Sequence, residues 1–167
     1  IRDMAREKYQ DHGVSYGLSE AGYDIRVKQE IRFLKQLYPS GEHREVYIDG
    51  ERTGEEFFAL ASTIEYFQMP TNLVGIVHDK STWARQGLSV FNTVLEPGWN
   101  GFLTLELALK SNRELVIPAG AGIAQVIFHE LSVPKSYGDG KYQNQEDKPV
   151  PSRWVSDEPA DMIGQHD

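Results

Sequence analysis

The stretch LEPGWNGFLTLELAL, residues 95–109, is the most informative part of this 167-residue sequence for the fold. Pro97-Gly98 is a turn signal, and the residues from Phe102 onward alternate in polarity. A period of two is typical of a β-strand with one buried face. One face of this strand would carry Leu103, Leu105 and Leu107, and the other would carry Thr104, Glu106 and Ala108.

Outside this stretch, other short apolar segments are separated by Gly, Pro and Asn, which predicts several more strands. The predicted strands lie within residues 23–27, 45–48, 57–67, 73–77, 88–91, 115–117 and 123–128. Short helices are expected at residues 2–12 and 81–86, the second with Ser81 as N-cap and Gly87 as stop. Many short strands with few short helices predict a mainly β fold, a barrel or jelly-roll-like structure.

The composition excludes several classes of protein. The sequence has no cysteine, which excludes disulfides, thiolate nucleophiles and zinc deaminases that bind the metal through cysteine. With 17 Lys and Arg against 25 Asp and Glu, the net charge of −8 argues against a nucleic-acid polymer as partner. No apolar run reaches the roughly 18 residues of a membrane span. Residues 1–10 do not resemble a signal peptide, so we expect a cytoplasmic location, in the host cytoplasm if the source is viral.

The composition changes near residue 132. Residues 132–167 are polar and rich in Pro and Gly, which is typical of a segment that contributes little to a core. We therefore expect residues 1–131 to form a β domain that begins with a helix, and residues 132–167 to form a C-terminal lid. The lid would be mobile without ligand; a frayed terminus is the alternative.

Two places carry groups suited to chemistry. Lys80, Ser81, Thr82 and Arg85 gather two cations and two hydroxyls, which suits an anion such as phosphate, although solvated surface residues are the alternative. Glu106 lies between two leucines of the predicted strand, where partial desolvation would raise its pKa and suit it to proton transfer. A solvent-facing glutamate on an amphipathic strand is the alternative.

Four segments resemble the motifs of the dCTP deaminases, which belong to the trimeric dUTPase superfamily. These segments are SYGLSEAGYDIRV (15–27), STWARQGLSVFNTVLEPGWNGFLTLEL (81–107), PAGAGIAQVIF (118–128), and GKYQNQ (140–145) with PSR (151–153). They follow one another in order over nearly the whole chain. The resemblance implies a distorted, dUTPase-like β-barrel or jelly-roll core, a homotrimer with active sites between subunits, and a lid that closes over the nucleotide.

The resemblance also implies roles for individual residues. Glu106 would be the catalytic acid and base, with Ser81 and Arg85 beside it; no zinc is required. Mg²⁺ would arrive with the triphosphate, held by phosphate oxygens and water rather than by protein ligands. The expected nucleotide-binding residues are Lys80, Thr82, Glu96, Thr104, Leu105, Tyr137, Lys141 and Gln145.

The implied reaction is the hydrolytic deamination of dCTP to dUTP and ammonia. Residues 87–99 form a shorter segment than in many deaminases and lack their Thr-Ala pair, and Glu96 stands where members usually have Asp. Two alternatives therefore stay open. One is a dUTP diphosphatase, or a bifunctional enzyme that releases dUMP and pyrophosphate from dCTP. The other is a nucleotide-sensing relative without activity.

Overall fold

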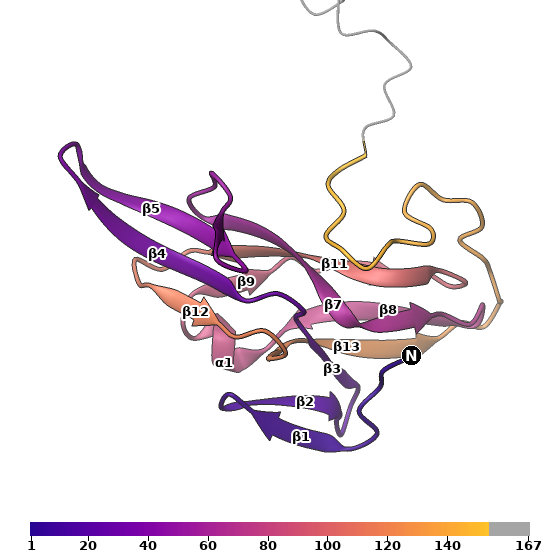
Figure 1. Cartoon of the computed structure of the whole chain (residues 1–167). Coiled ribbons are helices and arrows are strands. Elements are labelled where there is room, and N and C mark those ends of the chain that lie inside the picture. The colour runs from indigo at the N-terminus through magenta and orange to yellow at the C-terminus, as the bar shows by residue number, and fades with distance from the viewer. Residues whose placement is uncertain (154–167) are drawn as a thin grey trace, which may run out of the picture.

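The structure is a computed structural model that describes residues 1–153, so the end of the expected lid, residues 154–167, lies outside the described residues. Strands dominate the described part of the chain (Figure 1). In order, the elements are β1 (Lys8–Asp11), β2 (Val14–Leu18), β3 (Tyr23–Arg26), β4 (Ile31–Tyr38), β5 (Gly41–Ile48), β6 (Glu51–Arg52), β7 (Phe58–Gln68), β8 (Leu73–Asp79), α1 (Ser81–Ala84), β9 (Leu88–Val90), β10 (Val94–Leu95), β11 (Asn100–Leu109), β12 (Leu115–Ile117) and β13 (Gly122–Glu130).

The strands form three sheets that share one apolar core. The six-stranded sheet has the order β1-β2-β3-β13-β8-β10, the three-stranded sheet β7-β11-β9, and the four-stranded sheet β12-β4-β5-β6. The pairs within each sheet are antiparallel. The arrangement is jelly-roll-like and mainly β, as predicted, and over residues 1–153 the sheets stay separate rather than closing into a continuous barrel. None of the helices described is long and apolar enough to cross a membrane.

The predicted N-terminal helix is wrong. Residues 8–11 instead form β1, which pairs with β2 in a hairpin at the edge of the six-stranded sheet, with Lys8 opposite Gly17. The four residues of β1 are all exposed, so residues 2–12 lack the apolar face that would hold a helix on the core. Pairing with β2 satisfies their backbone groups instead.

The short helix α1 is close to the prediction but begins differently. Lys80, not Ser81, is the N-cap residue, and its side chain makes no capping hydrogen bond. Trp83 anchors the helix, because its ring is buried and its Nε1 donates to the Gly122 carbonyl at 2.7 Å. Gly87 follows with a φ of +90°, a conformation that favours glycine and ends the helix.

Strand β11 is the central element for the site. Leu105, Leu107 and Leu109 are buried in the core and Glu106 is only partly buried, so residues 105–109 alternate as predicted. Leu103, expected on the face of the other leucines, instead lines the same cavity as Thr104 and Glu106. The pairing of β11 with β7 is irregular between Phe102 and Thr104 and then regular, with Glu106 opposite Leu60. The side chain of Glu106 therefore leaves the sheet on the face away from Leu105 and Leu107.

The C-terminal segment, here defined as residues 132–153, crosses the beginning of β11 (Figure 1). Gln145 forms a parallel bridge with Gly101, and its carbonyl accepts a hydrogen bond from the Phe102 N–H at 3.1 Å. The Trp99 indole also donates to the Tyr142 carbonyl at 2.6 Å. Polar contacts with one turn and one strand thus join this segment to the β domain.

Candidate active site

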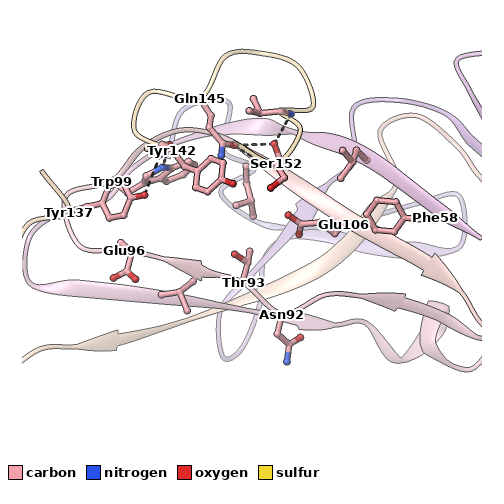
Figure 2. Close-up of a pocket in the computed structure, with 15 residues that line it drawn as sticks. Phe58, Asn92, Thr93, Glu96, Trp99, Glu106, Tyr137, Tyr142, Gln145 and Ser152 are labelled. Carbon is pink, nitrogen blue, oxygen red and sulfur yellow. Dashed lines mark hydrogen bonds between the residues drawn. The ribbon is translucent and has the colours of Figure 1, made fainter. Parts of the chain in front are cut away.

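A cavity of about 640 Å³ lies between β11, β10 and the C-terminal segment (Figure 2). It contains five of the residues that sequence analysis assigned to the site: Glu96, Thr104, Glu106, Tyr137 and Gln145. The segments that supply them are far apart in the sequence, and the pairing of the C-terminal segment with β11 brings them together. A cavity of this size is sufficient for a nucleoside and part of its phosphate chain.

Glu106 projects into this cavity from the middle of β11 (Figure 2). Partial burial raises the pKa of its carboxyl above the ordinary value for glutamic acid, and a hydrogen bond from its own backbone acts in the opposite direction. The apolar side chains of Phe58 and Leu60 line the wall beside it. The surroundings therefore favour the neutral form of Glu106 more than water does, which suits a group that exchanges protons.

Gln145 is fixed at the other end of the cavity. Its Oε1 accepts hydrogen bonds from the backbone N–H of Thr104 at 3.2 Å and from the Thr104 hydroxyl at 3.0 Å. The same hydroxyl oxygen accepts a bond from the Val150 N–H at 3.0 Å. Thr104 thus connects β11 to two points of the C-terminal segment, which sets the orientation of the Gln145 amide.

A second cavity, of about 380 Å³, lies beside α1 and includes one of the two expected cations, Lys80. Lys80, Ser81 and Thr82 line it together with Ser15 and Asp24. The Lys80 ammonium lies 2.6 Å from Asp24 Oδ2 and 3.1 Å from the Ser15 hydroxyl. The other carboxylate oxygen of Asp24 is buried and has no hydrogen-bond partner among the described residues, so it remains able to accept one.

Within this chain, the expected site residues therefore lie in two separate places. Glu106 lines the first cavity, whereas Lys80, Ser81 and Thr82 line the second. Three other expected residues line neither cavity: Arg85 is exposed, Leu105 is buried in the core, and Lys141 is exposed with its ammonium 3.3 Å from the Arg153 carbonyl.

Sequence analysis did not single out some residues that the structure places at these cavities. Asp24 and Ser15 line the second cavity, and Trp99 lines the first. Asp24 lies on the predicted strand 23–27 between two apolar neighbours, which is the same signal that identified Glu106. By contrast, the pattern around Ser15 has no comparable signal.

The fold of this chain is similar to that of solved dUTPases. It is similar to the native dUTPase of EIAV, with a TM-score of 0.50 and 18% identity over 80% of this chain and 92% of that one. It is also similar to a mutant dUTPase from phage phi11 of S. aureus, with a TM-score of 0.51 and 16% identity over 80% of this chain and 89% of that one. At these identities the similarity establishes the fold alone.

The sequence comparisons establish the family. The family model described as dCTP deaminase-like matches residues 1–131. A dCTP deaminase of Acinetobacter baumannii (strain AYE) is 39% identical over 145 residues, which cover 79% of this chain and 77% of that protein. A dCTP deaminase of Roseiflexus castenholzii is 39% identical over 158 residues, which cover 87% of this chain and 86% of that protein. The chain belongs to the dCTP deaminase-like family, which confirms the resemblance found in the sequence.

Proposed function

We propose that this protein catalyses the hydrolysis of dCTP to dUTP and ammonia. The observation that carries the proposal is the position of Glu106, a partly buried carboxyl with a raised pKa that projects into the largest cavity described above. Members of the family that match this chain over more than three quarters of its length are named dCTP deaminases, which supports the same reaction.

In the proposed mechanism, Glu106 takes a proton from a water molecule as the water oxygen attacks C4 of cytosine. The C4–O bond forms, and Glu106 passes this proton to the ring nitrogen N3. Glu106 then carries the second proton, from the hydroxyl now on C4, to the amino group, so that the C4=O double bond forms, the C4–N bond breaks and ammonia leaves. A general base of this kind typically contributes on the order of 10²–10⁴-fold. Phe58 and Leu60 exclude bulk water from one side of the carboxyl.

The triphosphate is proposed to bind at the second cavity, where Lys80, Ser81 and Thr82 supply charge and hydroxyl donors. Mg²⁺ would accompany the triphosphate and neutralise part of its charge. No group of three His, Cys, Asp or Glu residues within residues 1–153 is arranged to hold a metal ion. In the proposal, phosphate oxygens and water would coordinate Mg²⁺. Asp24, with its unpartnered buried oxygen, is the carboxylate best placed to face the water shell of that ion.

The separation of the two cavities in one protomer supports a homotrimer with shared sites. We infer that the segment from Lys80 to Arg85 of one subunit meets the Glu106 cavity of its neighbour, so that Arg85, exposed in one protomer, reaches the base. The C-terminal segment would cover the nucleotide from above the cavity. A cytoplasmic location, where deoxynucleotides are made and used, belongs to the same proposal.

A bifunctional reaction is the second candidate, because the Glu96 carboxylate lines the same cavity as Glu106. The resemblance placed Glu96 where dUTPases use an Asp to activate water. A second carboxylate could assist water attack on the triphosphate, releasing dUMP and pyrophosphate from the dUTP formed in the first step.

Incubation of the purified protein with dCTP and separately with dUTP, each with Mg²⁺, followed by anion-exchange separation of the products, tests both candidates. Formation of dUTP from dCTP, with dUTP itself left intact, identifies a deaminase. Formation of dUMP and pyrophosphate from both nucleotides identifies the bifunctional enzyme. A product only from dUTP would contradict the proposed function.

A further inference from the structure

Gln143 lies at the junction between the C-terminal segment and the turn that precedes β11. Its partly buried side chain uses both ends of the amide. Oε1 accepts hydrogen bonds from the N–H of Asn100 at 2.7 Å and from the N–H of Asn144 at 3.3 Å. Nε2 donates to the carbonyls of Gly98 and Gly138, each at 3.0 Å.

These four bonds join two different parts of the chain. Gly98 lies in the turn between β10 and β11 and Asn100 is the first residue of β11, whereas Gly138 and Asn144 belong to the C-terminal segment. One side chain therefore bridges the turn and both arms of the loop that crosses it. A single amide that satisfies four main-chain groups in this way fixes their relative positions more strongly than a single pair would.

The loop that Gln143 holds is the part of the segment that faces the cavity. Tyr137 and Tyr142 line the cavity on either side of this loop, and the Tyr142 N–H lies 3.3 Å from the Tyr137 hydroxyl (Figure 2). A Cβ at Gly140 would lie 2.2 Å from Cζ of Tyr137, so the loop closes tightly around that ring. Gln145 follows two residues after Gln143 and contacts β11 through Thr104.

We propose that Gln143 is a positioning residue: it seats residues 137–145 on the turn at 97–100, so that Tyr137, Tyr142 and Gln145 are already in place when the nucleotide enters the cavity. Its side chain is occupied by main-chain partners and acts through these three residues. The proposal rests on the proposed function for the identity of the nucleotide, but the seating itself is a property of the protein alone. Pre-organisation of this kind lowers the entropic cost of binding.

The test of seating uses no nucleotide. Lys141 is exposed and lies in the loop, where its carbonyl accepts a hydrogen bond from the Arg153 guanidinium at 2.6 Å, so trypsin should cleave after Lys141 faster when the loop leaves its place. The variant is Gln143→Ala, and the matched control is Gln10→Ala, because Gln10 is exposed on β1. We expect cleavage after Lys141, followed by intact mass, to become about tenfold faster in Gln143→Ala, the order expected for the loss of one or two net hydrogen bonds. The control should behave as wild type.

The test of positioning measures nucleotide affinity without turnover. Calorimetry compares dCTP binding to Glu106→Gln with binding to the double variant Glu106→Gln/Gln143→Ala. We expect about a tenfold weaker affinity in the double variant with an unchanged thermal midpoint, because the core does not depend on Gln143. In the active enzyme, Gln143→Ala should raise KM more than it lowers kcat. Gln143→Glu keeps an oxygen acceptor at this position, so its KM should lie between those of wild type and Gln143→Ala.

Cleavage after Lys141 at the wild-type rate would overturn the seating, and unchanged dCTP affinity despite faster cleavage would overturn the positioning role. If wild type does not deaminate dCTP, the proposed function fails, yet the cleavage and binding experiments still decide on Gln143.

Discussion

Oε1 of Gln145 accepts two hydrogen bonds from Thr104, one from its backbone N–H at 3.2 Å and one from its hydroxyl at 3.0 Å. The two residues are 41 positions apart in the sequence. Thr104 shares its strand face with Glu106, so this contact joins the proposed base to the segment that covers it. Strand β11 and the C-terminal segment are therefore joined by hydrogen bonds through Thr104.

Thr104→Val should remove the hydroxyl hydrogen bonds between β11 and the C-terminal segment. The valine cannot donate to Gln145 or accept from the Val150 N–H, and a buried group left without a partner costs about 1–3 kcal/mol. We expect a weaker affinity for dCTP together with a loss of stability of this order, measured by calorimetry and by denaturant unfolding. Thr104→Ser keeps the hydroxyl and should stay near wild type. If Thr104→Val binds dCTP as wild type does, the contact has no role in the site.

The buried salt bridge between Lys80 and Asp24 should contribute to the stability of the fold. Their side chains are only 11% and 3% exposed, and removal of one partner leaves a buried charge without compensation. Lys80→Met should therefore destabilise the fold by about 3 kcal/mol, measured by urea unfolding. Lys8→Met, which breaks the exposed pair with Glu20, is the control and should change stability little. Equal effects of the two substitutions would show that burial of the Lys80 pair is unimportant.

The raised pKa of Glu106 predicts two dependences on pH. The proposed base acts only when deprotonated, so kcat/KM for dCTP should fall as the pH drops through a value above the ordinary pKa of glutamic acid, which is about 4.3. A carboxyl whose pKa is raised on folding binds its proton more tightly in the folded state, so it destabilises the fold once both states are ionised.

Glu106→Gln should consequently raise the thermal midpoint slightly at neutral pH, and this gain should vanish in acid, where Glu106 is protonated in both states. Melting curves of the variant and of wild type between acidic and neutral pH check this. A variant less stable than wild type at neutral pH would show that Glu106 makes stabilising contacts in its ionised form.

The proposed trimer predicts complementation between inactive subunits. Glu106→Gln removes the base and Arg85→Ala removes the group expected from the neighbouring subunit. When both variants are unfolded together and refolded as a mixture, some sites combine an intact Glu106 with an intact Arg85. The mixture should regain about a quarter of wild-type activity if subunits assort at random. Light scattering should give a trimer for each variant. A mixture as inactive as its components would place all catalytic groups in one protomer.

Much of the fold could be predicted from the sequence because alternation identifies strands that have one buried face. Residues 115–117 form β12 as expected, and Glu106 projects from β11 as its pattern predicts. The helix expected at residues 2–12 failed because nothing in the charged, exposed residues 8–11 distinguishes a helix from an edge strand that pairs with its neighbour. Strand β4 was missed, although Ile31 and Phe33 are buried and Arg32 between them is exposed.

The site was less predictable than the strands. The residues near Ser81 and those near Glu106 could be chosen from chemical type, but their division between two cavities depends on which sheet carries each segment. The polar composition of residues 132–167 predicts a segment with little apolar burial, and it did not reveal the hydrogen bonds that join part of this segment to Gly98, Trp99 and Asn100. Composition measures apolar burial and is insensitive to such contacts.

The conversion of dCTP to dUTP by wild type and by Glu106→Gln, followed through the absorbance change as cytosine becomes uracil, tests the central claim most directly. The account predicts turnover by wild type and a loss on the order of 10²–10⁴-fold in the variant, with dCTP binding retained. Turnover by Glu106→Gln within a few-fold of wild type would contradict it.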